Sequence, residues 1–154
     1  MDRERYSLFK AEINEQLGMI ELLQNEIRDK IDSFGKSQES VDSMGYKLHN
    51  LYGAYEQLFK IVANFFENEI EGARYHADLL RRMKLTIEGI RPSLMSEGTY
   101  LLLDELRRFR HFFRHAYGVE LKAGRVKGVA ITAMKIGDEF AFDLKGFMKM
   151  LTPE

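Results

Sequence analysis

The densest group of side chains able to do chemistry in this chain lies within residues 107–115. Four of these nine positions are arginine and two are histidine: Arg107, Arg108, Arg110, Arg114, His111 and His115. An imidazole can take or give a proton near neutral pH, and a guanidinium binds phosphate through a planar fork of donors. Neighbouring arginines should favour the neutral form of each histidine, the form that a general base requires. The alternative is a solvated basic face paired with acidic residues of neighbouring helices.

Helical projection separates these residues from the side of the segment that should face the core. At about 100° per residue, one apolar stripe holds Leu102, Leu106, Phe109, Phe113 and Ala116. The opposite side crowds together Asp104, Arg107, Arg108, His111, Arg114 and His115. Like charges four residues apart destabilise an isolated helix, so this cluster suits an anionic partner. Arg110 and His115 are about 140° apart on an ideal helix, so either the helix end is distorted or a site forms between two copies.

Metal binding is a weaker interpretation of the two histidines. His111 and His115 have the i, i+4 spacing of a His-Glu-x-x-His motif, but Phe112 stands where the glutamate would be. No third ligand is evident, and the flanking arginines repel a cation. We therefore expect no metal site and no cofactor.

The cluster must be positioned by helices, because apolar residues recur at steps of three, four or seven along most of the chain. The pattern predicts helices over Tyr6–Phe34 and, with approximate bounds, over Ser40–Ile70, Arg74–Ile87, Leu94–Tyr117 and Lys122–Leu151. Gly35, the Gly72 region, the Gly89–Pro92 turn and Gly118 separate them. Val129–Thr132 alone could form a strand, but the surrounding spacing favours a helix. The predicted fold is an all-α antiparallel bundle of about five helices, formed as a single domain over residues 1–154.

Composition sets limits on the function. The chain has 154 residues, a net charge of −1 and no cysteine. A nearly neutral chain is not a polybasic nucleic-acid binder, so any nucleic-acid site must be local. The absence of cysteine excludes disulfides, zinc fingers and a thiol nucleophile. Since no run of about 18 apolar residues occurs and the N-terminus is charged, we expect a cytoplasmic protein without a membrane segment.

Arg110, His115 and Tyr117 together resemble the Arg-x4-6-His signature, in its His-x-Tyr form, of the HEPN superfamily. The resemblance is specifically to HepT-like toxins that pair with a minimal nucleotidyltransferase (MNT) antitoxin. It extends to Phe109–His111, Tyr117–Gly118, residues 75–80 with Met83, and Gly89–Pro92, and it covers the chain from about Leu51 to Leu151. Two departures are Tyr75, where tryptophan is expected, and Arg114, which gives His115 a more basic context.

This resemblance implies a metal-independent endoribonuclease that acts as a homodimer, with two motifs facing one cleft. As a hypothesis for the mechanism, His115 would move a proton at the ribose 2′-hydroxyl or the leaving oxygen, and Arg110 would stabilise charge on the phosphate. Arg107, His111 and Arg114 would hold the RNA backbone. The substrate would be RNA because the nucleophile is the 2′-hydroxyl. The resemblance also implies that the MNT antitoxin adenylylates Tyr117 and so silences the cleft.

A non-enzymatic interpretation stays open: a helical subunit that docks a substrate or target onto a partner nucleotidyltransferase. Retention of Arg110, His115 and Tyr117 together favours the nuclease. A di-iron or cytokine-like bundle is a weaker third interpretation, since no Glu-x-x-His pair is present for metal and no cysteine or leader suggests secretion. Outside the cluster, we interpret His76 as an interhelical histidine and Arg91 as a residue that caps or pairs near its turn. His49 has no motif around it.

Overall fold

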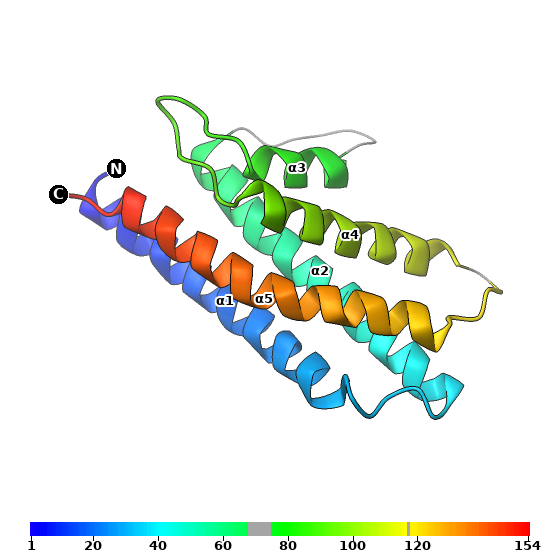
Figure 1. Ribbon diagram of the computed structural model, residues 1–154. Coiled ribbons are helices and arrows are strands. Elements are labelled where there is room, and N and C mark those ends of the chain that lie inside the picture. The colour runs from blue at the N-terminus through cyan, green and yellow to red at the C-terminus, as the bar shows by residue number, and fades with distance from the viewer. Residues whose placement is uncertain (68–74, 117) are drawn as a thin grey trace.

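The computed structural model describes residues 1–67, 75–116 and 118–154, and this part of the chain forms five helices and no strand. The helices are α1 (Arg3–Lys30), α2 (Gln38–Phe66), α3 (Tyr75–Met83), α4 (Glu97–His115) and α5 (Ala123–Leu151) (Figure 1). The all-α prediction is confirmed. Residues 129–132 lie inside α5, so the helical interpretation of that segment is also correct.

Consecutive long helices run in opposite directions, and α2 lies at the centre of the bundle (Figure 1). It packs against each of the other four helices, while α5 packs against α1 and α4. The short α3 covers one end of α2 and α4. The two termini lie side by side, where the Tyr6 hydroxyl is 3.2 Å from Oγ1 of Thr152.

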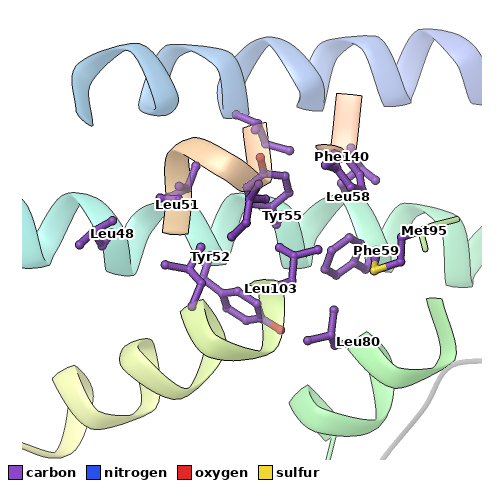
Figure 2. Close-up of a cluster of buried hydrophobic side chains, with 14 of the residues drawn as sticks. Leu48, Leu51, Tyr52, Tyr55, Leu58, Phe59, Leu80, Met95, Leu103 and Phe140 are labelled. Carbon is purple, nitrogen blue, oxygen red and sulfur yellow. The ribbon is translucent and has the colours of Figure 1, made fainter. Parts of the chain in front are cut away.

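The core follows the apolar face of α2, as its periodicity predicted. Figure 2 shows that the buried α2 side chains meet labelled residues of α3, α4 and α5 and of the loop before α4. The labelled residues are Leu48, Leu51, Tyr52, Tyr55, Leu58 and Phe59 of α2, with Leu80, Met95, Leu103 and Phe140. Removing this area from water is the main stabilising contribution in such a bundle.

Within the described ranges, none of the helices has both the length and the apolar character needed to cross a bilayer.

Several predicted helix boundaries differ from the observed ones by a few residues. α1 ends at Lys30 rather than Phe34, and Gly35 then takes a positive φ of 112° in the turn to α2. α2 ends at Phe66, because Glu67 adopts extended backbone; Ile70 and Gly72 lie outside the described residues.

α3 ends at Met83 rather than Ile87, because its last carbonyls are taken by the following loop. Leu94 donates its backbone N–H to the Met83 carbonyl at 2.8 Å, and the Arg91 guanidinium donates to the Arg82 carbonyl at 3.0 Å. The backbone N–H of Leu85 also donates to the Arg82 carbonyl, and that of Ile87 donates forward to the Arg91 carbonyl instead of back to Met83, so the helix ladder does not continue.

α4 begins at Glu97 rather than Leu94. The hydroxyl of Ser96 accepts a hydrogen bond from the backbone N–H of Thr99 at 3.2 Å, which makes Ser96 the N-cap. Leu94 instead lies in the preceding loop, where it is fully buried.

Candidate functional site

The start of α4 is tied to α5, which fixes how the helix presents the residues at its other end. The Asp143 carboxylate of α5 accepts from the Thr99 hydroxyl at 2.6 Å and from the Ser96 backbone N–H at 3.0 Å. From this anchor α4 runs to His115, and its last turn carries Arg114 and His115. Cations in this position interact favourably with the negative end of the helix dipole.

α4 buries a slightly different stripe from the one that projection placed in the core. Leu106 and Phe109 are buried as predicted, but Leu103 is buried in place of Leu102, which is only half-buried. Phe113 and Ala116 are also half-buried. The prediction that His111, Arg114 and His115 lie on the exposed side is confirmed.

His111 and His115 form a pair on the outer face of α4. Their ring centroids are 4.5 Å apart, and both side chains line an open groove of about 370 Å³. The groove is also lined by Arg107, Arg108, Phe112, Ala116 and Val119. Arg125 of α5 stacks over the Phe112 ring, with its guanidinium carbon 3.9 Å from the centroid. Two imidazoles and several guanidinium groups therefore share one solvent-accessible surface.

The arginines of this groove are partly neutralised by Asp104, one turn earlier on α4. Asp104 Oδ1 accepts from Nε of Arg107 at 2.9 Å and lies 2.8 Å from its Nη2. The second oxygen, Oδ2, is 3.4 Å from Nε of Arg108. Arg107 is thus held in a defined position, while the Arg108 side chain is 67% exposed and extends into solvent.

Arg110 lies on a different face of α4 and is directed toward α2. Its side chain is 18% exposed, its Nη1 is 3.9 Å from Oε1 of Glu56, and its guanidinium lies over the Tyr52 ring at 6.0 Å. Its buried Nε has no hydrogen-bond partner among the described residues. The carboxylate of Glu56 is buried and also contacts α3, since its Oε2 is 2.7 Å from Nδ1 of His76.

Arg110 and His115, the two catalytic residues of the predicted motif, are therefore not brought together within one chain. Arg110 faces Glu56, whereas His115 lies with His111 in the outer groove. This agrees with the 140° separation estimated from helix geometry, since α4 continues to His115 before it ends. Tyr117, the predicted modification site, lies outside the described residues.

Tyr52 is a neutral phenol beside Arg110. Burial raises its pKa above the ordinary value of 10, and the nearby charge of Glu56 raises it further. Among the described residues its buried hydroxyl has no hydrogen-bond partner. Its ring extends from α2 toward α4 (Figure 2).

Sequence reasoning missed two residues of α2 that border this site, His49 and Glu56. His49 lies close enough to Arg110 and Arg114 for their charges to lower its pKa, although burial is the larger cause. A signal was present in the sequence. Glu56 interrupts an otherwise apolar helical face, and His49, Tyr52 and Glu56 have the i, i+3, i+7 spacing that puts side chains on one side of a helix.

The interpretations of His76 and Arg91 as structural residues agree with their contacts. His76 joins α3 to α2 through Glu56. Arg91 has a fully buried side chain that pairs with Glu67 and donates to the carbonyls of Leu85, Arg82 and Pro92. It holds the turn after α3 in place.

Metal ligands do not gather in the described part of the chain, which contains no group of three or more His, Asp or Glu side chains placed to hold an ion.

Comparison with known protein families matches residues 43–151 to a family described as HepT-like protein. The matched range begins within α2, ends with α5 and contains the positions of Arg110, His115 and Tyr117. Comparisons with curated proteins and with solved structures gave no match. Because the family match covers more than two thirds of the chain, the protein belongs to the HepT-like family of HEPN-type proteins.

Proposed function

We propose that the protein is a metal-independent endoribonuclease whose catalytic groups lie in the C-terminal half of α4. The observation that carries the proposal is the exposed pair of His111 and His115, 4.5 Å apart in a groove lined by Arg107 and Arg108. Membership of a family related to ribonuclease toxins supports the same activity. Two imidazoles beside guanidinium groups provide proton transfer and phosphate binding in one place.

His115 acts as one proton-transfer group. One imidazole takes the proton of a ribose 2′-hydroxyl, and O2′ then forms a bond to the adjacent phosphorus. The P–O5′ bond breaks, and a protonated imidazole gives its proton to O5′. The products are a 2′,3′-cyclic phosphate and a 5′-hydroxyl, so no metal and no external cofactor are consumed. The second imidazole is either His111 of the same helix or His115 of a second protomer.

Arg110 completes the site across a two-fold dimer. Within one protomer Arg110 faces Glu56 and lies on a different face of α4 from the groove. A homodimer with two α4 ends at one cleft brings the Arg110 of one protomer toward the His115 of the other. Arg107, His111 and Arg114 then hold the RNA backbone, and the doubled positive charge attracts it.

Tyr117 is the regulatory position in this proposal. An MNT-type nucleotidyltransferase antitoxin adenylylates its hydroxyl with ATP and releases pyrophosphate. The phosphodiester adds a negative charge two residues after His115, where it competes with RNA phosphate for the arginines of α4. Peptide mass mapping after incubation with partner and ATP tests the assignment; a mass increase on a different residue would remove Tyr117 from this role.

The nuclease is tested with purified protein and end-labelled single-stranded RNA in excess chelator. Because general acid–base catalysis contributes roughly 10²- to 10⁴-fold, His115→Ala should lower the cleavage rate by about that factor. Arg110→Lys keeps the charge but loses the donor fork and should also slow cleavage. Lys145→Ala removes an exposed cation of α5 and serves as the control. Equal cleavage by His115→Ala, or complete dependence on a divalent ion, would refute the mechanism.

A docking subunit without catalytic activity is the second candidate, and the placement of Arg110 is the observation that favours it. Its guanidinium is mostly buried against Glu56 and Tyr52, as in a residue that holds two helices together. The exposed basic groove would then bind the partner nucleotidyltransferase. This candidate predicts no chelator-resistant cleavage, and partner binding that is lost in Arg107→Glu and kept in Arg110→Lys.

A further inference from the structure

A stack of three aromatic rings runs from the α2–α4 contact out to solvent. Phe113 of α4 lies against the His49 ring with centroids 5.2 Å apart and ring planes tilted by 46°. Tyr46 lies one turn before His49 on α2, with centroids 6.3 Å apart and ring planes only 8° from parallel. Tyr46 is 58% exposed. The outer ring of the stack therefore presents an aromatic surface to solvent.

Close packing at Gly45 holds the inner ring of the stack in place. A Cβ atom at Gly45 would lie 2.8 Å from Cδ1 of Leu121 and 3.3 Å from Cε2 of Phe113, both inside normal contact distance. Phe113 therefore rests against the backbone of α2, and His49 rests on Phe113. The inner rings of the stack are therefore held by the packing of two helices, and they support the Tyr46 ring from one side.

Positive charge borders the stack. Burial lowers the pKa of His49 below its ordinary value of 6.5, a hydrogen bond with Asn50 opposes this, and Arg110 and Arg114 lower it further. At neutral pH the imidazole is thus an uncharged ring with two guanidinium groups nearby. Flat aromatic faces beside arginines match the chemistry of unpaired nucleotides, whose bases stack and whose phosphates carry negative charge.

We propose that Tyr46, supported by His49 and Phe113, is a stacking platform for an unpaired base of single-stranded RNA, while Arg114 binds the adjacent phosphate. This inference rests on the proposed ribonuclease function and extends it to how the substrate is selected. The platform prefers unpaired over paired RNA, because a base inside a duplex has no free face. Stacking is tolerant of base identity, so the preference is for strand state rather than for sequence.

The test measures binding of two short fluorescent probes of equal length at one salt concentration. One is a 2′-O-methyl oligoribonucleotide, which has no 2′-hydroxyl nucleophile, and the other is an abasic oligomer with the same number of phosphates. Tyr46→Ala removes the platform, and Tyr46→Phe keeps the ring. Phe142→Ala is the matched control, because Phe142 is an exposed ring on α5 near the start of α4. Arg114→Ala removes one phosphate contact.

The wild-type protein and the Tyr46→Phe and Phe142→Ala variants should bind the base-containing probe roughly 5- to 100-fold more tightly than the abasic one. Tyr46→Ala should remove most of this difference in affinity, whereas Arg114→Ala should weaken the binding of both probes by a similar factor. No preference in the wild type, or an unchanged preference in Tyr46→Ala, would overturn the platform.

Cleavage of unmodified RNA in chelator separates this inference from the proposed nuclease. Cleavage without a Tyr46-dependent base preference removes the platform and leaves the nuclease. A Tyr46-dependent preference without cleavage supports the platform and removes the nuclease. If the protein neither binds the probes nor cleaves RNA, both proposals are wrong.

Discussion

Replacing Glu56 by glutamine should destabilise the bundle, because this buried carboxylate joins three helices beside the candidate site. The glutamate belongs to α2, its Oε2 is 2.7 Å from Nδ1 of His76 on α3, and its Oε1 is 3.9 Å from Nη1 of Arg110 on α4. Lys60, one turn later on α2, also lies 3.9 Å from Oε1. Glutamine keeps the shape and an acceptor oxygen but removes the charge.

The expected loss follows from the exposure of the three partners. Two unit charges about 4 Å apart interact by about 1 kcal/mol in water and about 4 kcal/mol at an effective dielectric constant near 20. The side chain of His76 is 48% exposed and that of Lys60 is 36% exposed, so water compensates much of the loss of their interactions with Glu56. Arg110 is 18% exposed and is compensated less. We therefore expect a decrease of about 2 kcal/mol in the free energy of unfolding, below the roughly 3–5 kcal/mol that is typical of breaking a fully buried pair.

Equilibrium urea denaturation measures this change. With an m-value of about 2 kcal/mol/M, the midpoint should fall by about 1 M. Glu12→Gln is the matched control, since Glu12 is exposed on α1 and its substitution should shift stability by less than about 0.5 kcal/mol. If Glu56→Gln had the same urea midpoint as this control, the view that the carboxylate anchors Arg110 would be refuted. RNA cleavage by the folded variant then reports separately on whether the position of Arg110 matters for activity.

Three further predictions concern other buried or tied groups. Arg91→Met should lower stability by about 3–5 kcal/mol in the same assay, because it removes a fully buried guanidinium bonded to a glutamate and three carbonyls; a loss below about 1 kcal/mol would contradict this. The pKa of His49 is lowered in the folded state from the ordinary value of 6.5 that it has in the unfolded chain. Between the lowered pKa and 6.5 the unfolded chain binds more protons, so the free energy of unfolding falls as the pH falls through this range. His49→Gln should therefore lose less stability than wild type between pH 7.5 and pH 5, and parallel profiles would exclude the effect. Asp143→Ala should cost about 1–2 kcal/mol, because the carboxylate accepts from the Thr99 hydroxyl and a backbone N–H, whereas exposed Asp138→Ala on the same helix should change little.

The sequence predicted the order and type of the helices well, because each long helix has a sustained apolar stripe. The predicted ends were less accurate for a physical reason. α3 stops at Met83 because Leu94 and the Arg91 side chain take the carbonyls of its last turn. These donors come from a loop up to eleven residues later, and local periodicity contains no information about them.

For the candidate site, residue types predicted the cluster, and helix geometry predicted that Arg110 and His115 point in different directions. The partners of Arg110 required tertiary structure. Glu56 and His49 lie more than 50 residues before Arg110, and only the packing of α2 against α4 brings them close. The available signal was a charged residue, Glu56, within an apolar helical face. The sequence did not show which helix packs over this face, so the partners of Glu56 could not be predicted.

The near neutrality of the chain and the local positive charge of α4 are compatible because different carboxylates serve different arginines. Asp104 neutralises part of the outer groove and holds Arg107, while Glu56 compensates Arg110 on the inner face. Arg114 is exposed in the last turn of α4, between these two regions. Arg107, Arg108 and Arg110 each pair with a carboxylate, whereas Arg114 has no such partner among the described residues. Under the proposed function, Arg114 is therefore the arginine of α4 that is most available to an incoming phosphate. This distribution explains how a chain with a net charge of −1 can offer a confined site for an anion without a generally basic surface.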